Sequence, residues 1–135
     1  LSTNNMILSN PRPQEFIDAV SCYSDFVSWV PSDTTTPYIF KAPENELELL
    51  NEGNILHHCV ASYRDLIIDN GCIVVFMRKR DDPDTPFVTI EYLNGKTVQV
   101  KEKYNEDVED KKVLEVIGKW LAVTRRKEIA KFSGK

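Results

Sequence analysis

The fold is decided by residues 71–103, which read GCIVVFMRKRDDPDTPFVTIEYLNGKTVQVKEK. The run from Cys72 to Met77 is continuously apolar and has the length of a buried strand. The run from Phe87 to Leu93 alternates and is β-rich, and the Asn94-Gly95 pair after it is the strongest short signal for a hairpin. Residues Lys96 to Lys103 then alternate again. We therefore expect an antiparallel three-stranded β-meander.

Helical periodicity flanks these strands on both sides. Pro13 suits a first helical turn, and the apolar residues after it recur with helical spacing as far as Val30, where Pro31 is expected to end the helix. A long helix is expected from about Asp107 to about Ala130, because its apolar positions are interleaved with charged ones. The meander therefore has helices before and after it that can cover its apolar surface.

Two shorter helices are expected just before the strands. Pro43 and the carboxylates that follow it are typical of a helix start, and Gly53 is expected to stop that helix. Asn54 can cap the next helix, which Asn70-Gly71 closes. The sequence thus predicts an α+β fold, in which the meander packs against N-terminal helices, a central helical corner and a long C-terminal helix.

The composition is that of a globular domain. Of the 135 residues, 41% are hydrophobic and 28% are charged. This length suits one ordinary domain, which we expect to span residues 13–135 after a flexible lead-in at 1–12. No apolar run approaches the roughly 18 residues that a membrane helix needs, and no signal peptide opens the sequence. We therefore expect a cytoplasmic protein that does not contact a membrane.

The cysteines argue against two kinds of scaffold. Cys22, Cys59 and Cys72 are odd in number and form no C-x-x-C pair, so neither a disulfide framework nor a four-cysteine zinc site is expected. A zinc site made by His58 and Cys59 is also not expected, because the side chains of adjacent residues diverge on a helix. The sequence thus assigns no metal, and it does not indicate which cofactor, if any, the protein uses.

Charge is distributed unevenly along the chain. The formal net charge is −4, but residues 1–70 hold three basic and ten acidic residues, whereas residues 71–135 hold fourteen basic and eleven acidic ones. From Gly118 to Lys135, six basic residues face only Glu128. An acidic protein is poorly suited to coat DNA indiscriminately. Its basic end is nevertheless suited to phosphate or to an acidic partner.

The most specific pattern is EGNILHHCVASY, at residues 52–63. It resembles the signature of the PcfJ-like family, whose hallmark is His-Cys-Val, here residues 58–60, between Glu-Gly and Tyr. The family is found in conjugative plasmids and phages, so the resemblance implies a protein of a mobile genetic element. It covers roughly residues 38–123, and its further matches are Gly71, Arg78, Thr89-Ile90-Glu91, Gln99, Asn105 and Trp120.

Two positions depart from the family pattern. Ala61 stands where a glycine often follows the triplet, which exchanges one small residue for another. Glu102 stands where a glycine is expected before the asparagine, and this change could alter the loop that carries Asn105. The resemblance implies a fold and a site more than it implies a reaction.

The residues themselves suggest acid–base chemistry. His57, His58 and Cys59 are expected near the start of a helix, where free N–H groups favour a neutral imidazole, lower the pKa of a thiol and can bind phosphate. A neutral histidine can act as a base, and a thiolate as a nucleophile. Gln99 and Asn105 offer amides that could hold a substrate or an oxyanion, and Glu91 could orient a histidine or act as a base.

Each candidate also has a purely structural interpretation. Cys59 and Tyr63 lie on the apolar stripe of their helix and are expected in the core, whereas His58 lies on another face, which favours a functional role. Asn105 could be the N-cap of the last helix. Arg78 could belong to a solvated strand end or bind phosphate. Glu91 and Gln99 could simply lie on a half-exposed strand face.

Two functions remain open at this point. In the first, the domain is an enzyme acting on a nucleic acid or nucleotide: His58, Glu91, Gln99 and Asn105 are catalytic, and Cys59, Tyr63 and Arg78 bind the substrate. In the second, it is a non-catalytic module whose basic C-terminal helix, at Arg125-Arg126-Lys127, contacts nucleic acid or a protein partner. A papain-like reaction at Cys59 is less expected, because the two histidines lie beside it on the same helix.

Overall fold

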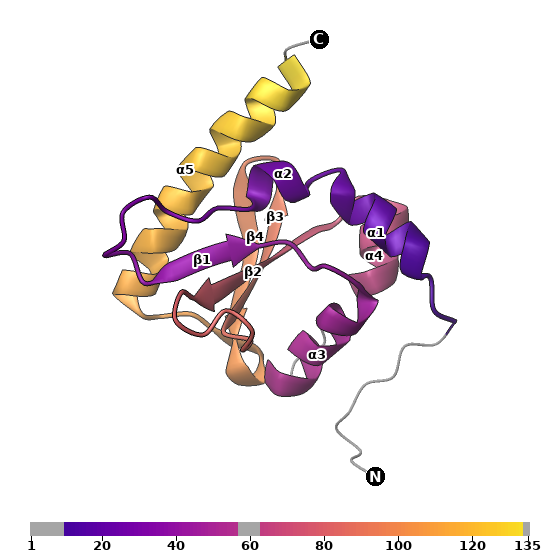
Figure 1. Cartoon of the computed structure of the whole chain (residues 1–135), viewed down its shortest axis with the longest axis horizontal. Helices are drawn as coiled ribbons and strands as arrows, with labels where there is room; N and C mark the ends of the chain where they lie inside the picture. The colour runs from indigo at the N-terminus through magenta and orange to yellow at the C-terminus, as the bar shows by residue number, and fades with distance from the viewer. Residues whose placement is uncertain (1–9, 57–62, 134–135) are drawn as a thin grey trace.

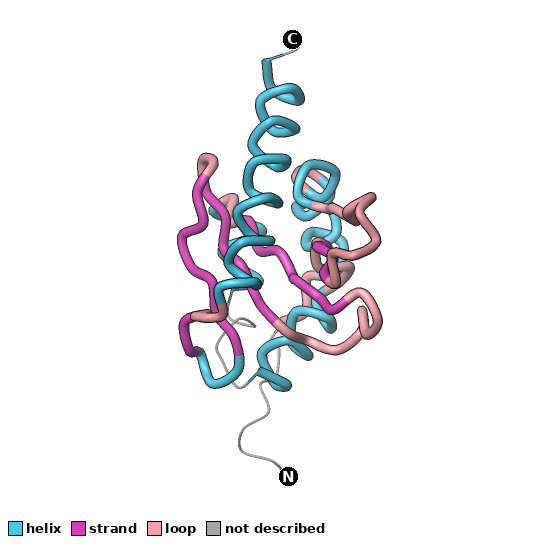
Figure 2. Tube along the Cα trace, turned by 90° about the vertical axis from the view of Figure 1, so that its left-hand side faces the viewer, coloured by secondary structure: helices cyan, strands magenta, loops and turns pink. Residues whose placement is uncertain are grey.

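The computed structural model describes residues 10–56 and 63–133. It shows an α+β domain, with one antiparallel sheet between two groups of helices (Figure 1). On one side of the sheet lie α1 (Pro13–Ser21), α3 (Glu46–Leu56) and α4 (Tyr63–Asn70), and on the other lies α5 (Lys111–Ser133). The view in Figure 2 places α5 in front of the strands, so the sheet separates it from α1, α3 and α4 behind.

The sheet contains five strands in the order β1-β2-β3-β4-β5. The predicted meander is present as β2 (Ile73–Lys79), β3 (Val88–Leu93) and β4 (Lys96–Glu102). Asn94 and Gly95 both have positive φ, 50° and 81°, as a two-residue hairpin turn with the right twist requires. The hairpin prediction is thus confirmed.

The predicted number of strands was wrong, because each edge of the meander has an additional strand. The short apolar stretch β1 (Tyr38–Lys41) pairs with β2, and the two-residue β5 (Glu106–Asp107) pairs with β4. Both strands are too short for an alternating pattern to be recognised in the sequence. They matter for the site because β1 extends the covered face of the sheet, and β5 begins the turn into α5.

The predicted helix from Pro13 to Val30 is also wrong, since it is broken in the middle. α1 ends at Ser21, and α2 (Ser24–Val27) is a separate single turn. After it the chain is extended, and Trp29 exchanges backbone hydrogen bonds of 2.9 Å with Phe40 of β1. Pairing with the edge strand replaces the last helical turn, and Val30, expected on the buried stripe, is 65% exposed.

Gly53 does not stop a helix, and Asn54 does not begin one. Both lie inside α3, which continues to Leu56. Glycine costs a helix only about 1 kcal/mol relative to alanine, and α3 buries Leu49, Glu52 and Leu56 along one side, which outweighs that cost. The predicted corner is therefore not at Gly53, and residues 57–62 lie outside the described structure. α4 does close as expected, with Gly71 at φ 70°.

The C-terminal helix α5 supplies the main cover of the second face of the sheet. It begins at Lys111 rather than near Asp107, because residues 106–107 pair in the sheet as β5. Asp110 caps it, accepting a hydrogen bond of 2.9 Å from the backbone N–H of Lys112. Its buried positions are Val113, Val116, Ile117, Trp120 and Thr124. In the described part of the chain, no helix is long and apolar enough to cross a membrane.

Candidate functional site

Strand pairing places several of the predicted residues on one face of the sheet. Residues paired directly across antiparallel strands point to the same side, and alternate residues along a strand do so too. Glu91 of β3 pairs with Gln99 of β4, and Thr89 lies two residues before Glu91. Thr89 pairs with Phe76, two residues before Arg78. These side chains share the face that α3 covers, whereas Ile90 and its neighbours face α5.

A buried ion pair joins α3 to this face. Glu52 accepts hydrogen bonds from Arg78, at 2.6 Å to Oε1 from Nη2 and at 3.1 Å to Oε2 from Nη1. The hydroxyl of Thr89 donates to Oε2 of the same carboxylate at 2.6 Å. Glu52 is 0% exposed and Arg78 2%, so water does not screen the pair. We call Glu52, Arg78 and Thr89 the buried cluster.

Burial dominates the electrostatics of this cluster. Desolvation raises the pKa of Glu52, and the hydrogen bonds from Arg78 and Thr89 oppose that rise. The guanidinium Cζ lies 4.6 Å from the centroid of the Phe76 ring, so one face of Arg78 packs on an aromatic surface. Among the described residues, its Nε is buried and has no hydrogen-bond partner. The cluster thus contains a polar donor that the described side chains do not satisfy.

Glu91 and Gln99 lie further along the same face and are open to solvent. Glu91 is half-buried and Gln99 is exposed. Their alignment depends on a bulge: the register shifts beyond Glu91, so Thr97 pairs with Tyr92 and Val98 is left 50% exposed. The alternation predicted for Lys96 to Lys103 is therefore interrupted, since Thr97 and Gln99 lie on opposite faces of the sheet. The bulge turns Gln99 to the face that carries Glu91.

Cys72, which precedes β2, is adjacent to Glu91. Desolvation, together with the charge of Glu91 and a hydrogen bond to it, raises the pKa of the Cys72 thiol to about 12. A thiol with this pKa is protonated at neutral pH, so Cys72 is not a nucleophile of this face.

The raised pKa of Cys72 predicts that an alkylating reagent will react with Cys72 more slowly than with Cys22. At pH 8 the Cys72 thiol would be almost entirely protonated, so iodoacetamide should modify exposed Cys22 first. Tryptic mass spectrometry would follow each cysteine on its own peptide. In urea, where the protein is unfolded, Cys72 should react as fast as Cys22. Equal rates in the folded protein would contradict the assigned environment.

Asn105 lies in the turn between β4 and β5, not at the start of α5. It belongs to the 3-10 turn η2 (Lys103–Asn105), is exposed, and has a positive φ of 58°. The interpretation of Asn105 as an N-cap is wrong, because Asp110 fills that role. Asparagine tolerates the left-handed conformation better than most residues do. η2 contacts α3, so Asn105 is near the helix that carries Glu52.

His58 and Cys59 lie outside the described residues, so their catalytic and binding roles stay predictions. Tyr63 opens α4, is half-buried and packs against the core, as expected from its apolar stripe. Within residues 10–56 and 63–133, no three His, Cys, Asp or Glu side chains are grouped to hold a metal ion.

Charged side chains hold α3 and α4, the helices on either side of residues 57–62. Arg64 of α4 is buried and donates to Oε2 of Glu46 in α3 at 2.7 Å. The backbone N–H of Arg12 donates to the same oxygen at 2.9 Å, and its guanidinium binds Asp69 of α4. Glu46 thus connects α3 to Arg64 of α4 and to Arg12, and Arg12 in turn binds α4. The two ends of the signature segment are therefore fixed by ion pairs as well as by apolar packing.

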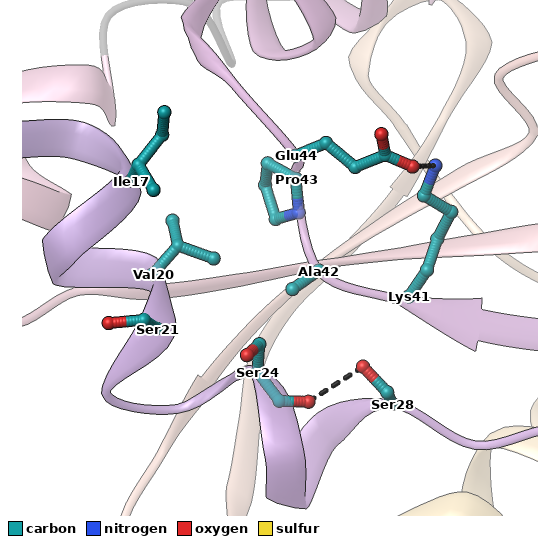
Figure 3. Close-up of a pocket in the computed structure, with 9 residues that line it drawn as sticks. All are labelled: Ile17, Val20, Ser21, Ser24, Ser28, Lys41, Ala42, Pro43 and Glu44. Carbon is teal, nitrogen blue, oxygen red and sulfur yellow. Dashed lines mark hydrogen bonds and ion pairs between the residues drawn. The ribbon is translucent and has the colours of Figure 1, made fainter. Parts of the chain in front are cut away.

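A separate cavity of about 410 Å³ lies between α1, α2 and the end of β1 (Figure 3). Its walls are mainly apolar and serine side chains, and Lys41 at its edge is paired with Glu44 at 3.1 Å. The predicted site residues do not line this cavity. It is thus distinct from the polar sheet face.

Sequence reasoning did not identify Glu52 and Thr89 as site residues, although both lie within the matched pattern. A signal for Glu52 was present: it falls three residues after Leu49 and four before Leu56, on the buried side of the helix. A carboxylate at such a position requires a buried partner. The partner, Arg78, is 26 residues away and could not be identified from spacing.

The chain was compared with known proteins. The family model described as PcfJ-like protein matches residues 30–115. An uncharacterized protein of Listeria innocua serovar 6a is 32% identical over 97 residues, which are 70% of this chain and 21% of that protein. The chain thus spans about a fifth of the length of this relative. No solved structure matches the chain.

Proposed function

Because this chain belongs to the PcfJ-like protein family, we propose that it serves a mobile genetic element as a domain that binds and processes a nucleic acid or nucleotide. The proposed site is the sheet face of Glu91 and Gln99, together with His58 of the family signature. The observation that carries the proposal is the buried cluster of Glu52, Arg78 and Thr89 on that face.

The buried cluster is an expensive feature for a domain of this size. Removing two charges from water costs several kcal/mol per ion, and a pair of apolar residues often stabilises a core as well or better. Charged groups in such surroundings concentrate at functional sites. The cluster lies on the same face of the sheet as Glu91 and Gln99, which reach solvent. It connects this face to α3, the helix that covers it. This placement favours a site over an ordinary core.

The proposed roles follow from exposure and chemistry. His58 is the general acid or base, and Glu91 orients it or shares the proton. The exposed amides of Gln99 and Asn105 hold the substrate, and Cys59 and Tyr63 shape its binding surface. Arg78 has a different part from the phosphate ligand first expected. Since its guanidinium is buried on Glu52, it supports the site electrostatically and does not touch the substrate unless Glu52 moves.

The proposal concerns this domain alone. The relative from Listeria innocua is about five times longer than the segment it shares with this chain. We therefore assign the proposed activity and substrates to this domain, and not to a longer protein that contains it.

The test compares His58→Ala and Gln99→Ala with the wild type. ATP, GTP and labelled 20-residue single-stranded DNA, duplex DNA and RNA are the probes, and binding and product formation are measured for each. We expect both variants to remain folded and to lose at least tenfold in processing of whichever probe the wild type uses. Gln14→Ala, at an exposed glutamine of α1, is the matched control and should behave as wild type.

A pH profile separates catalysis from structure. If His58 transfers a proton, the wild-type rate should depend on the protonation of this imidazole, and His58→Ala should lack that pH dependence. A folded His58→Ala variant that processes the probe at the wild-type rate would contradict the proposal that the domain is an enzyme. So would a wild type that turns over none of the probes.

A further inference from the structure

Charge is segregated across the sheet. On one side, α1, α3 and α4 carry seven acidic residues and one basic residue, whereas α5 on the other side carries seven basic and two acidic ones. Figure 2 shows α5 lying in front of the strands, with its C-terminal end extending beyond them. We infer that the outward side of α5 is a binding surface for the sugar-phosphate backbone of a nucleic acid.

Three cations form a row along this side. Lys112, Lys119 and Arg126 are exposed and spaced by seven residues, which is close to two helical turns. They therefore lie above one another, about 10 Å apart along the helix axis. We call them the basic row. The buried residues of α5, such as Trp120, follow a different stripe of the helix, about a third of a turn away, so the row lies on an exposed flank of α5.

Two further cations of α5 are already engaged. Lys127 donates to the carbonyl of Ser28 at 2.9 Å, and Lys131 donates to the carbonyl of Cys22 at 2.8 Å and pairs with Asp25. The predicted Arg125-Arg126-Lys127 face is therefore split. Arg125 lies over the hairpin turn, where its Nε is 3.2 Å from the position that a Cβ of Gly95 would take. Arg126 alone of the three belongs to the basic row.

Few acidic groups oppose the row. Glu115 lies 3.6 Å from Lys119, and both are largely exposed, so this pair is weak and can exchange for a phosphate. Asp33, from the loop before β1, is within electrostatic reach of Lys119. Asp110 is committed to the helix cap near Lys112. The acidic helices lie beyond the sheet, and at physiological salt a charge is screened over about 8 Å.

The surface fits a nucleic acid better than a protein partner. A stable protein interface needs an apolar centre, whereas the positions between the cations of the row include Glu115 and Ala122. Phosphate contacts need cations alone, and their positions do not require a particular base sequence. The described α5 has 23 residues, so it is about 34 Å long, close to one turn of duplex DNA. Repulsion between phosphate and the carboxylates of α1, α3 and α4 would then turn that side of the domain away from the DNA.

The test measures binding to labelled 20-base-pair DNA and 20-residue single-stranded DNA by fluorescence anisotropy at 50 to 200 mM salt. Three phosphate contacts should give a slope of log affinity against log salt of about −2.7 on duplex DNA. Lys119→Glu and Arg126→Glu should each weaken binding at 50 mM salt about tenfold, and the double variant should remove about two units of slope. All three positions in the row are exposed, so the fold should be preserved, which circular dichroism would check.

Lys79→Glu is the matched control, because it makes the same charge change at an exposed lysine of β2, outside α5 and outside the basic row. It should bind within twofold of the wild type. The inference is overturned if the wild type binds neither DNA at 50 mM salt, or if the control weakens binding as much as the row variants do. It is also overturned if only His58→Ala and Gln99→Ala abolish binding, an outcome that would favour the proposed site instead.

Discussion

Replacement of Trp120 by alanine is expected to lower the free energy of unfolding by about 3–5 kcal/mol, the usual range for a fully buried tryptophan. The side chain is 0% exposed. Its ring stacks on Phe40 with centroids 5.2 Å apart and meets Tyr92 edge-on at 5.8 Å. Its indole N–H donates to the carbonyl of Val27 at 2.7 Å. One residue thus connects α5 to β1, β3 and α2.

Urea unfolding followed by circular dichroism at 222 nm would measure this loss. Trp120→Phe is the informative companion: it keeps most of the ring but leaves the carbonyl of Val27 without its donor, so its cost should be well below that of alanine. Leu114→Ala, at a partly exposed position of the same helix, is the control and should cost under about 1 kcal/mol. A Trp120→Ala variant as stable as that control would contradict the described packing.

Replacement of Glu52 by glutamine should destabilise the protein by about 3–5 kcal/mol, because the charge of Arg78 would stay buried without a counter-charge. The change keeps the size of the side chain, so the loss reports on charge rather than on a cavity. Arg78 is 2% exposed and cannot reach water without local unfolding. Thr89 would also lose the charged acceptor of its hydrogen bond.

A double-mutant cycle separates this effect from general damage. Arg78→Met alone should also be costly, since it leaves Glu52 unpaired, but Glu52→Gln with Arg78→Met should lose much less than the sum of the two single variants. Urea unfolding of all four proteins gives the coupling energy. Additive losses would mean that the two groups do not interact as described. Asn51→Gln changes an exposed neighbour of Glu52, and it is the control for the effect of a substitution on the stability of α3 itself.

The strands could be predicted from the sequence because their signals are local. The apolar run at residues 72–77 and the Asn94-Gly95 turn each lie within a few residues, and both predictions are confirmed. The break after Ser21 and the passage of α3 through Gly53 depend instead on distant partners. Trp29 pairs with Phe40, and α3 is held by buried contacts across the sheet. Local propensity could not anticipate either.

The candidate site was predictable only in part. The matched pattern drew attention to Glu91 and Gln99, and strand pairing places them opposite each other. The bulge that turns Gln99 to this face cannot be recognised in an alternating sequence. Nor could spacing reveal that Arg78 is buried against Glu52, since a basic residue at a strand end usually faces water. The three-dimensional partner, not the residue type, decides each of these outcomes.

The extent of the hydrophobic core has a consequence for defining domain boundaries. The family match covers residues 30–115, but Phe16, Val27 and Trp120 lie outside it and are among the most completely buried side chains. The segment recognisable by homology is therefore smaller than the cooperative folding unit. An expressed fragment trimmed to the match would present bare apolar surface on both sides of its sheet, and it would aggregate rather than reveal any activity of the domain.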